Sequence, residues 1–236
     1  MKKKTKKKLN FKRTLVFILF LYIVGFSIYL LVNQKIKHIE INGNNLVKDS
    51  EILRVSKLKD YPSMLRYSSR SIKKNIQSIE LIDTVKVKKW FGSKVIIDIK
   101  ENKVLFYYKD TDKIALSNGN IIKNNYNLLG IPILISDLKG DVFNDLVKYY
   151  KVLNDNIIYE INSIEYFPLK DENGNIIGDK RFKIIMNDTN TIIVNTKTIS
   201  VLNKYNDIYA SLGGRVGTIN IDSDEISNLV FIPYEG

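Results

Sequence analysis

The most conspicuous pattern along the chain is an uninterrupted apolar run near its N-terminus. Residues 14–33, TLVFILFLYIVGFSIYLLVN, contain no charged side chain. A helix of this length rises about 30 Å, the thickness of a bilayer core. Gly25-Phe26-Ser27 has the small-x-small form of a signal-peptide cleavage site, but cleavage there would leave an apolar stub on the mature chain. The pattern therefore favours an uncleaved transmembrane helix over a signal peptide.

The hydrophobic period changes several times in the segment that follows. A short strand is predicted from Ile36 to Ile41, because Asn42-Gly43-Asn44 is a turn signal. Two helices should follow, on either side of a break at Tyr61-Pro62. The residues that can cap them are Asp49 or Ser50 for the first helix, and Ser68, Ser69 or Ser71 for the second.

Strict alternation then predicts a hairpin with one buried face. Val85 and Val87 alternate with lysines, and Val95, Ile97 and Ile99 alternate across the second strand. The order of elements is β-α-α-β-β, which describes a small α+β domain.

Strand-like segments dominate the rest of the chain. They are residues 104–108, 113–117, 120–123, 131–135, 164–167, 181–186, 191–195, 216–221 and 229–234. One helix is expected from Asp141 to Leu153, and another from Thr196 or Thr198 to Gly213-Gly214. This pattern predicts a mostly antiparallel sheet with two helices against it, so the fold class of the whole chain is α+β.

The positive charge is concentrated before the apolar run. The chain has 37 Lys plus Arg against 25 Asp plus Glu, a net charge of +12. Eight basic residues and no acid lie within residues 2–13: Lys2, Lys3, Lys4, Lys6, Lys7, Lys8, Lys12 and Arg13. Such a cluster holds its side of the helix in the cytoplasm and can attract anionic lipid. Because the remaining chain is nearly balanced, no nucleic-acid partner is expected.

Candidate catalytic chemistry is sparse. The absence of Cys excludes thiolate catalysis and disulfides, and the only histidine, His38, sits in the strand pattern as a structural residue. Asp171–Asn175 lacks the ligand spacing of a calcium loop, and Asp222–Glu225 is interpreted as a polar loop rather than a cation site. A pair of carboxylates for glycan cleavage stays open, since only their separation in space decides it. We predict no catalytic residue, cofactor or metal site, and favour a binding protein over an enzyme.

Several short motifs occur in a meaningful order. They are Ile39-Glu40-Ile41-Asn42-Gly43-Asn44, Val85-Lys86-Val87-Lys88-Lys89-Trp90, Lys94-Val95-Ile96-Ile97-Asp98-Ile99-Lys100-Glu101, Ile114–Ile122 around Asn118-Gly119, Gly130-Ile131-Pro132-Ile133-Leu134, and Lys204 followed by Gly217-Thr218-Ile219-Asn220-Ile221-Asp222. With the basic tail and apolar helix, they resemble the bacterial cell-division family FtsQ/DivIB. Phe91 and Asn102 depart from the family pattern, which usually has Pro and Arg there, and Asp222 is shifted relative to it.

The resemblance implies an organisation and a role. Residues 1–13 would be a cytoplasmic tail, 14–33 a single membrane span, 34–102 an extracytoplasmic POTRA domain and 103–236 a β-rich distal domain. The protein would be a non-catalytic subunit of the division machinery at the septum. Its implied partners are small bitopic proteins of the FtsL and DivIC/FtsB types, with septal peptidoglycan synthases as further partners.

The last strand is the candidate binding site. A terminal sheet edge offers unpaired N–H and C=O groups that a partner segment can complete by β-augmentation. The candidate residues are Asn228, Leu229, Val230, Phe231, Ile232, Pro233, Tyr234 and Arg215. Leu229, Phe231 and Tyr234 could instead face the core. If Phe231 faces outward, Phe231→Lys should weaken partner binding without unfolding the chain.

Three other functions compete with this interpretation. A POTRA-bearing transport component would use its sheet edge to guide polypeptides, although no barrel-length set of strands follows. A membrane-anchored cell-wall enzyme or regulator would need a pocket with perturbed carboxylates. A general extracytoplasmic scaffold would not concentrate at septa.

Overall fold

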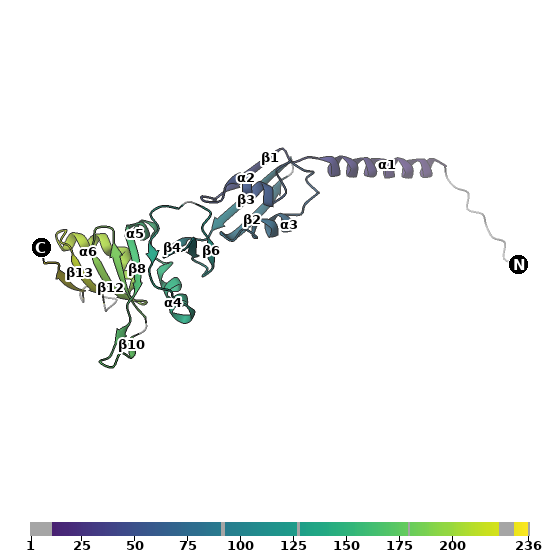
Figure 1. Cartoon of the computed structure of the whole chain (residues 1–236). Helices are drawn as coiled ribbons and strands as arrows, with labels where there is room; N and C mark the ends of the chain where they lie inside the picture. Colours follow the sequence, from purple (N-terminus) through teal and green to yellow (C-terminus); the bar gives the residue numbers. More distant parts are fainter. Residues whose placement is uncertain (1–10, 91–92, 127, 179, 222–228, 236) are drawn as a thin grey trace. The chain divides into compact units, whose positions relative to one another are not determined.

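The computed structural model describes residues 11–90, 93–126, 128–178, 180–221 and 229–235. The chain divides into two compact units, residues 1–101 and 102–236 (Figure 1). We describe each unit by itself.

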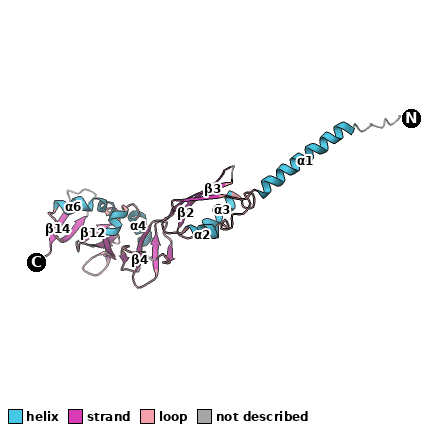
Figure 2. Cartoon of the chain, turned by 90° about the horizontal axis from the view of Figure 1, so that it is seen from above, coloured by secondary structure: helices cyan, strands magenta, loops and turns pink. Residues whose placement is uncertain are grey.

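Helix α1, Phe11–Asn33, carries the apolar run (Figure 2). It begins three residues before the predicted span and ends at the predicted residue. None of its side chains is buried against the protein. It is long and apolar enough to cross a membrane and fits a single-pass anchor.

The rest of the first unit has the predicted β-α-α-β-β order. Its elements are β1 (His38–Asn42), α2 (Asp49–Val55), α3 (Ser69–Ile76), β2 (Ile82–Trp90) and β3 (Lys94–Glu101). Strand β3 lies in the middle of the sheet, parallel to β1 and antiparallel to β2. The buried side chains of β3 (Val95, Ile97 and Ile99) alternate with more exposed ones, so the predicted one-faced burial is confirmed.

The two helix starts differ in how they are capped. Ser68 precedes α3, and its hydroxyl oxygen accepts the N–H of Ser71 at 3.1 Å, as one of the predicted caps requires. The predicted caps of α2 are wrong, because Lys48 occupies the N-cap position and Asp49 is the first helical residue. The Asp49 carboxylate accepts a hydrogen bond from the side-chain amide of Asn44 at 2.7 Å.

A tight loop after β1 depends on one glycine and one carboxylate. Gly43 has φ +82°, and a Cβ there would lie 2.2 Å from the carbonyl oxygen of Ile99. The Glu101 carboxylate accepts the backbone N–H groups of Asn45 at 3.1 Å, Leu46 at 3.0 Å and Val47 at 2.9 Å. These contacts fix the loop to the end of β3.

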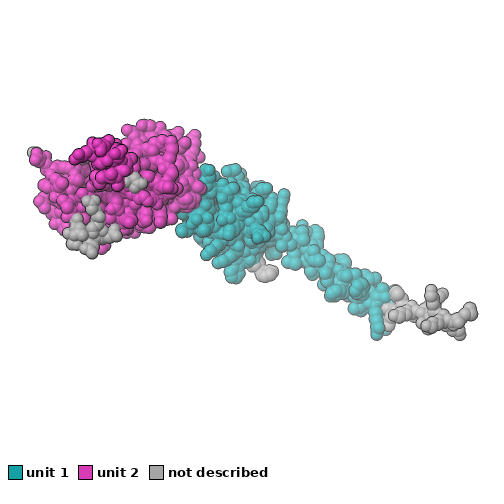
Figure 3. Space-filling model, turned by 90° about the horizontal axis from the view of Figure 1, so that it is seen from below, with its two compact units in different colours: residues 1–101 teal, residues 102–236 magenta. Residues whose placement is uncertain are grey.

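The second unit, residues 102–236, is magenta in Figure 3. It contains a nine-stranded sheet. The strand order is β14-β13-β12-β11-β8-β7-β4-β5-β6. The strands are β4 (Val104–Tyr108), β5 (Lys113–Leu116), β6 (Ile121–Lys123), β7 (Ile133–Leu134), β8 (Ile161–Tyr166), β11 (Arg181–Met186), β12 (Thr191–Asn195), β13 (Gly217–Ile221) and β14 (Leu229–Pro233). The β4–β7, β7–β8 and β12–β13 pairs are parallel and the remaining pairs are antiparallel, so the predicted mostly antiparallel sheet is confirmed.

The helical segments are more numerous than predicted. They are α4 (Gly140–Tyr150), α5 (Asp155–Glu160), the 3₁₀ segment η1 (Ile199–Lys204) and α6 (Tyr205–Ser211). The helix predicted to end at Leu153 ends at Tyr150, and Lys139 rather than Asp141 precedes it. Thr198 precedes η1 but does not cap it. Its hydroxyl oxygen accepts the N–H of Asn195 at 3.1 Å, and its hydroxyl donates to the carbonyl oxygen of Ile221 at 3.0 Å.

Two strand predictions were also incomplete. Val104, Leu105 and Phe106 are all buried, so β4 is covered on both faces, which its sequence pattern did not indicate. The Asn173-Gly174 turn joins a separate hairpin, β9 (Leu169–Lys170) with β10 (Ile176–Gly178), which has no partner strand in the large sheet among the described residues.

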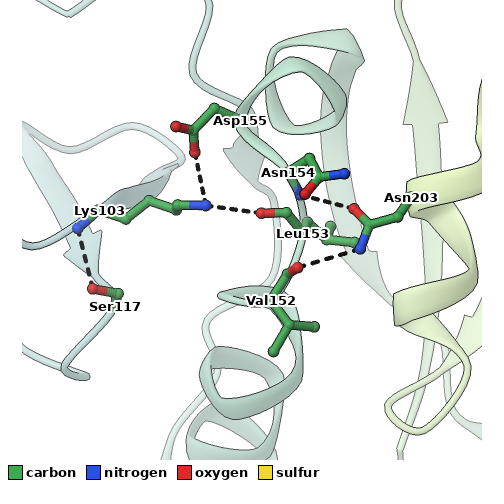
Figure 4. A network of polar contacts seen from close by, with 7 residues as sticks. All are labelled: Lys103, Ser117, Val152, Leu153, Asn154, Asp155 and Asn203. Atoms are coloured by element: carbon green, nitrogen blue, oxygen red, sulfur yellow. Dashed lines mark hydrogen bonds and ion pairs between the residues drawn. The ribbon is translucent and has the colours of Figure 1, made fainter.

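A polar network fastens the α4–α5 connection to its neighbours (Figure 4). The Lys103 ammonium donates to the carbonyl oxygen of Leu153 at 2.8 Å and pairs with the Asp155 carboxylate at 2.7 Å. The Asn203 amide oxygen accepts the N–H of Asn154 at 2.7 Å, and its amide nitrogen donates to the carbonyl oxygen of Val152 at 3.3 Å. The start of β4, the connection and η1 are thereby joined around one core.

Candidate partner-binding edge

Strand β14 forms one edge of the nine-stranded sheet. Among the described strands it pairs only with β13, antiparallel, with Ile219 opposite Phe231 and Gly217 opposite Pro233. The open side of such a strand presents backbone groups that another chain can bind.

The ladder shows which backbone groups point outward. The N–H of Tyr234 donates to the carbonyl oxygen of Val216 at 3.1 Å. Because backbone direction alternates along an antiparallel strand, residues 232 and 230 also direct their groups toward β13. Leu229, Phe231 and Pro233 direct theirs outward, and Pro233 supplies only a carbonyl. The open ladder therefore offers two N–H and three C=O groups.

The side chains of β14 divide between two faces. Leu229 and Phe231 are half-buried and pack against the hydrophobic core. The Arg215 guanidinium lies over the Phe231 ring, 5.3 Å from its centroid. Phe231 is therefore part of the packed face, and the condition for the Phe231→Lys test, an outward ring, is not met.

The opposite face of β14 is apolar and open to solvent. Val230 is 56% exposed and Ile232 is 59% exposed. Tyr234 is also exposed, and its hydroxyl donates to the side-chain oxygen of Thr191 at 2.6 Å. Asn228 lies outside the described residues.

Close packing on Gly217 sets the position of β14. A Cβ on Gly217 would lie 2.3 Å from the carbonyl oxygen of Ile232 and 2.8 Å from Cα of Pro233. The N–H of Gly217 donates to the side-chain oxygen of Asn190 at 2.8 Å. Only glycine allows this approach, which is one of its recognised roles at strand positions.

Asn190 belongs to a buried network below this contact. Its amide nitrogen donates to the Tyr205 hydroxyl at 2.9 Å, and that hydroxyl donates to the Asp188 carboxylate at 2.5 Å. Burial, followed by the hydrogen bond to Asp188, raises the pKa of Tyr205 well above its ordinary value. The network locks the turn before β12 to α6 and supports β13 from beneath. Asp188-Thr189-Asn190 has residue types that are typical of a turn, but nothing in the sequence indicates the contacts of Asn190.

The opposite edge strand is a poorer template. β6 has three residues and ends in Lys123, a residue type that natural edges use to discourage pairing. β14 has five residues and no charge. The contrast favours β14 as the edge that receives a partner.

The basic residues near the N-terminus and His38 form no common site among the residues that the structure describes. Lys12 and Arg13 lie in the first turn of α1, whereas Lys2, Lys3, Lys4, Lys6, Lys7 and Lys8 lie outside the described residues. His38 is exposed in β1. No group of three or more His, Asp or Glu side chains in the described part of the chain could hold a metal ion.

The oxygens of the Asp171 carboxylate accept hydrogen bonds from residues of the same turn. The carboxylate accepts the side-chain amide of Asn175 at 3.0 Å and the backbone N–H groups of Asn175 at 2.7 Å and Asn173 at 3.0 Å. These hydrogen bonds, led by the Asn175 side chain, hold the pKa of Asp171 below its ordinary value. Asp222–Glu225, the other acidic segment, lies outside the described residues.

Comparison with known proteins first gives the class of the first unit. Residues 34–102 match the family model described as "POTRA domain, FtsQ-type". The chain is 26% identical over 212 residues to the cell division protein DivIB of Staphylococcus aureus strain NCTC 8325, covering 86% of this chain and 46% of that protein. It is 27% identical over 208 residues to DivIB of Macrococcus caseolyticus, covering 85% and 68% respectively.

The chain thus spans about half the length of the S. aureus relatives that it matches. A solved structure of the major extracytoplasmic domain of DivIB from Geobacillus stearothermophilus is 20% identical, with a TM-score of 0.37, and the match covers 50% of this chain and 98% of that one. The POTRA match and the DivIB relatives support the predicted resemblance to the FtsQ/DivIB family.

Proposed function

We propose that this protein is a non-catalytic subunit of the bacterial division machinery. In this proposal, β14 binds an extended segment of a small bitopic division protein of the FtsL or DivIC/FtsB type. The observation that carries it is an uncharged edge strand with an outward ladder and two exposed apolar side chains, in a chain whose relatives are named cell division proteins.

β-Augmentation suits the chemistry of this edge. A segment laid beside β14 would exchange hydrogen bonds with Leu229 and Phe231 and donate to the Pro233 carbonyl. Because Pro233 has no N–H, the ladder would end there, which limits the length of segment that can pair. Backbone bonds would supply affinity, while side-chain contacts would set the partner's register.

Val230 and Ile232 would contribute those side-chain contacts. Both lie on the solvent face of β14, adjacent to an added strand. Complete burial of such a side chain contributes about 1.5–3 kcal/mol, so burying the exposed part of each contributes about 1–2 kcal/mol. Their exposure in the free protein leaves that free energy available for binding.

The membrane helix would hold this edge on the extracytoplasmic side of the membrane. We propose that α1 spans the cytoplasmic membrane once, that the basic N-terminal tail stays in the cytoplasm, and that both units lie outside. Through its partners the protein would help to control septal peptidoglycan synthesis.

Co-purification of the full-length chain with its co-expressed bitopic partners tests the binding step. Val230→Lys with Ile232→Lys should reduce recovery of the partners at least about tenfold, which corresponds to about 1.4 kcal/mol. Ile121→Lys, at an exposed apolar position on the opposite edge strand β6, is the matched control and should leave recovery unchanged. Equal recovery with both variants would reject β14 as the binding edge.

An intact fluorescent fusion at the N-terminus tests the broader role in growing cells. A band at midcell before constriction is expected. Uniform membrane fluorescence throughout the cycle, from a functional fusion, would instead favour a general scaffold or a polypeptide-transport component.

A further inference from the structure

Three segments of the first unit meet where α1 joins it. The N–H of Ile36 donates to the carbonyl oxygen of Pro62 at 3.0 Å, and the N–H of Met64 donates to that of Gln34 at 2.8 Å. On the other side, the N–H of Lys37 donates to the carbonyl oxygen of Ser93 at 2.8 Å. The loop around residues 61–67 and the end of the β2–β3 hairpin are therefore fastened to residues 34–37.

This attachment fixes their distance from the membrane. Asn33 is the last residue of α1, and consecutive Cα atoms are about 3.8 Å apart. Residues 34–37 consequently lie within about 15 Å of the end of the helix, whatever the angle at which α1 leaves the unit. The segments hydrogen-bonded to them share this position.

The same region exposes three large apolar or aromatic side chains. Leu65 is 64% exposed, Trp90 is 57% exposed and Tyr61 is 44% exposed. Their combination of aromatic rings and an aliphatic side chain is typical of protein surfaces that contact the interface between lipid head groups and acyl chains.

Positive charge surrounds these side chains. Lys35, Lys37 and Arg66 are exposed, and none of them forms an ion pair within the described residues. Glu40, in the neighbouring strand β1, pairs with Lys94 at 2.6 Å. Asp60, beside Tyr61, is the one acidic residue within residues 34–38, 59–67 and 88–94.

A lysine holds the loop in place. The Lys89 ammonium donates to the carbonyl oxygen of Met64 at 2.6 Å and also to that of Tyr67. Desolvation lowers the pKa of Lys89. Its charge is directed into the protein, and the loop that presents Leu65 and Arg66 is fixed to β2.

We propose that this surface, defined by Lys35, Lys37, Tyr61, Leu65, Arg66 and Trp90, rests on the head-group layer of the membrane that α1 crosses. Trp90 and Leu65 enter the interface, and the three cations bind anionic phospholipid head groups. The proposal depends on α1 being the membrane anchor and is independent of partner binding by β14. Continuity with the anchor and the sign of the charge both favour lipid as the occupant.

The chain contains a built-in probe, because Trp90 is its only tryptophan. The full-length protein is reconstituted in vesicles of phosphatidylcholine, with or without phosphatidylglycerol, containing lipid brominated near the glycerol end of its acyl chains. Bromine should quench Trp90, and quenching should be stronger with phosphatidylglycerol. Equal quenching in both mixtures, or a Trp90 open to aqueous acrylamide in both, would overturn the proposal.

Charge reversal tests the cations. Lys35→Glu, Lys37→Glu and Arg66→Glu together should lower the ratio of docked to undocked protein at least about tenfold, since each charge near an anionic surface contributes a roughly fivefold factor. Lys48→Glu, Lys73→Glu and Lys74→Glu, elsewhere on the same unit, form the charge-matched control and should retain quenching. Quenching that is the same in both triple variants would reject the assignment.

A salt titration of the unmodified protein tests the same cations without variants that could misfold. Raising the salt concentration screens exposed charges, so the additional quenching due to phosphatidylglycerol should disappear. Persistence of that difference at high salt would contradict head-group binding by the three cations.

Discussion

At the scale of single residues, Gly217 determines how closely β14 can approach the sheet. Gly217→Ala would place a Cβ against the backbone of Ile232 and Pro233, atoms that cannot move without shifting the strand. We expect a cost of about 1–3 kcal/mol, the usual range for overpacking, concentrated in β14. Hydrogen exchange of the β14 amides should show faster opening.

Gly174→Ala is a suitable comparison for this variant. Gly174 has open space around its Cβ position but a φ of +83°, so only backbone strain of about 1 kcal/mol is expected, confined to the β9–β10 hairpin. If β14 exchanges equally slowly in both variants, Gly217 does not position the edge.

Glu101 is a second residue with a disproportionate role. Glu101→Ala leaves the N–H groups of the 45–47 loop without their carboxylate acceptor, and we expect a loss of about 2–3 kcal/mol in the stability of the POTRA unit. Denaturant unfolding of the full chain in detergent should show an earlier transition for this unit. Glu80→Ala, at an exposed carboxylate of the same unit, should be nearly neutral.

Buried tyrosines predict a loss of stability in alkaline solution. Burial raises the pKa of Tyr150 and Tyr205 well above normal, and burial with the nearby Asp137 charge raises that of Tyr108 to about 12. The folded state therefore favours neutral phenols. Stability is retained below pH 10, the ordinary tyrosine pKa, and falls as pH rises above it, because the unfolded chain ionises first.

Absorbance of tyrosinate, measured together with circular dichroism, checks this expectation. Exposed tyrosines should ionise first, and the buried groups should ionise only as the second unit unfolds. Tyr205→Phe should weaken the alkaline dependence, whereas Tyr159→Phe, at an exposed position, should preserve it. Ionisation of every tyrosine outside the membrane helix in one step near pH 10, with the fold intact, would contradict the burial.

At the scale of elements, the two faces of β14 separate stability from binding. Phe231→Lys should destabilise the second unit by about 1–2 kcal/mol, because it removes half-buried packing and the contact with Arg215. Ile232→Lys should change stability by less than about 0.5 kcal/mol, because its side chain is exposed. Thermal unfolding distinguishes them, and equal midpoints would refute the assignment of faces.

Elements with a clear hydrophobic period or turn signal were predicted from the sequence. The alternation around Val95, Ile97 and Ile99 and the Asn118-Gly119 turn specified hairpins that the structure contains. α5 was missed because six residues, Asp155–Glu160, are too few to establish a helical period. The strand at residues 104–108 was predicted, but its pattern gave no indication that both faces of β4 would be buried.

For the candidate edge β14, too, the local pattern predicted the strand but not its tertiary contacts. The position of β14 at the end of the sheet was expected from its place at the end of the chain. Alternation along the strand divided its side chains into two sets, one for each face. The sequence did not establish which set faced the core, because Phe231 and Ile232 are both apolar. Gly217, Asn190 and Tyr205 support the edge through tertiary contacts between distant segments, which no local pattern encodes.

At the scale of the whole molecule, separate parts of the chain have separate proposed tasks. α1 anchors the chain, the proposed membrane surface lies beside the anchor, and β14 belongs to the second unit. The two binding activities should therefore be separable. Val230→Lys with Ile232→Lys should leave quenching of Trp90 by brominated lipid unchanged, and the Lys35, Lys37 and Arg66 reversals should leave partner recovery within about twofold.

The central claim, partner binding at β14, is tested most directly by photo-crosslinking in dividing cells. A photoreactive phenylalanine analogue is placed at position 230 or 232 on β14, and at position 121 on β6 for comparison. We expect crosslinks from 230 and 232 to a small bitopic division protein and none to that protein from 121. Crosslinks to it from 121 alone, or none from any β14 position in a functional chain, would contradict the proposed edge.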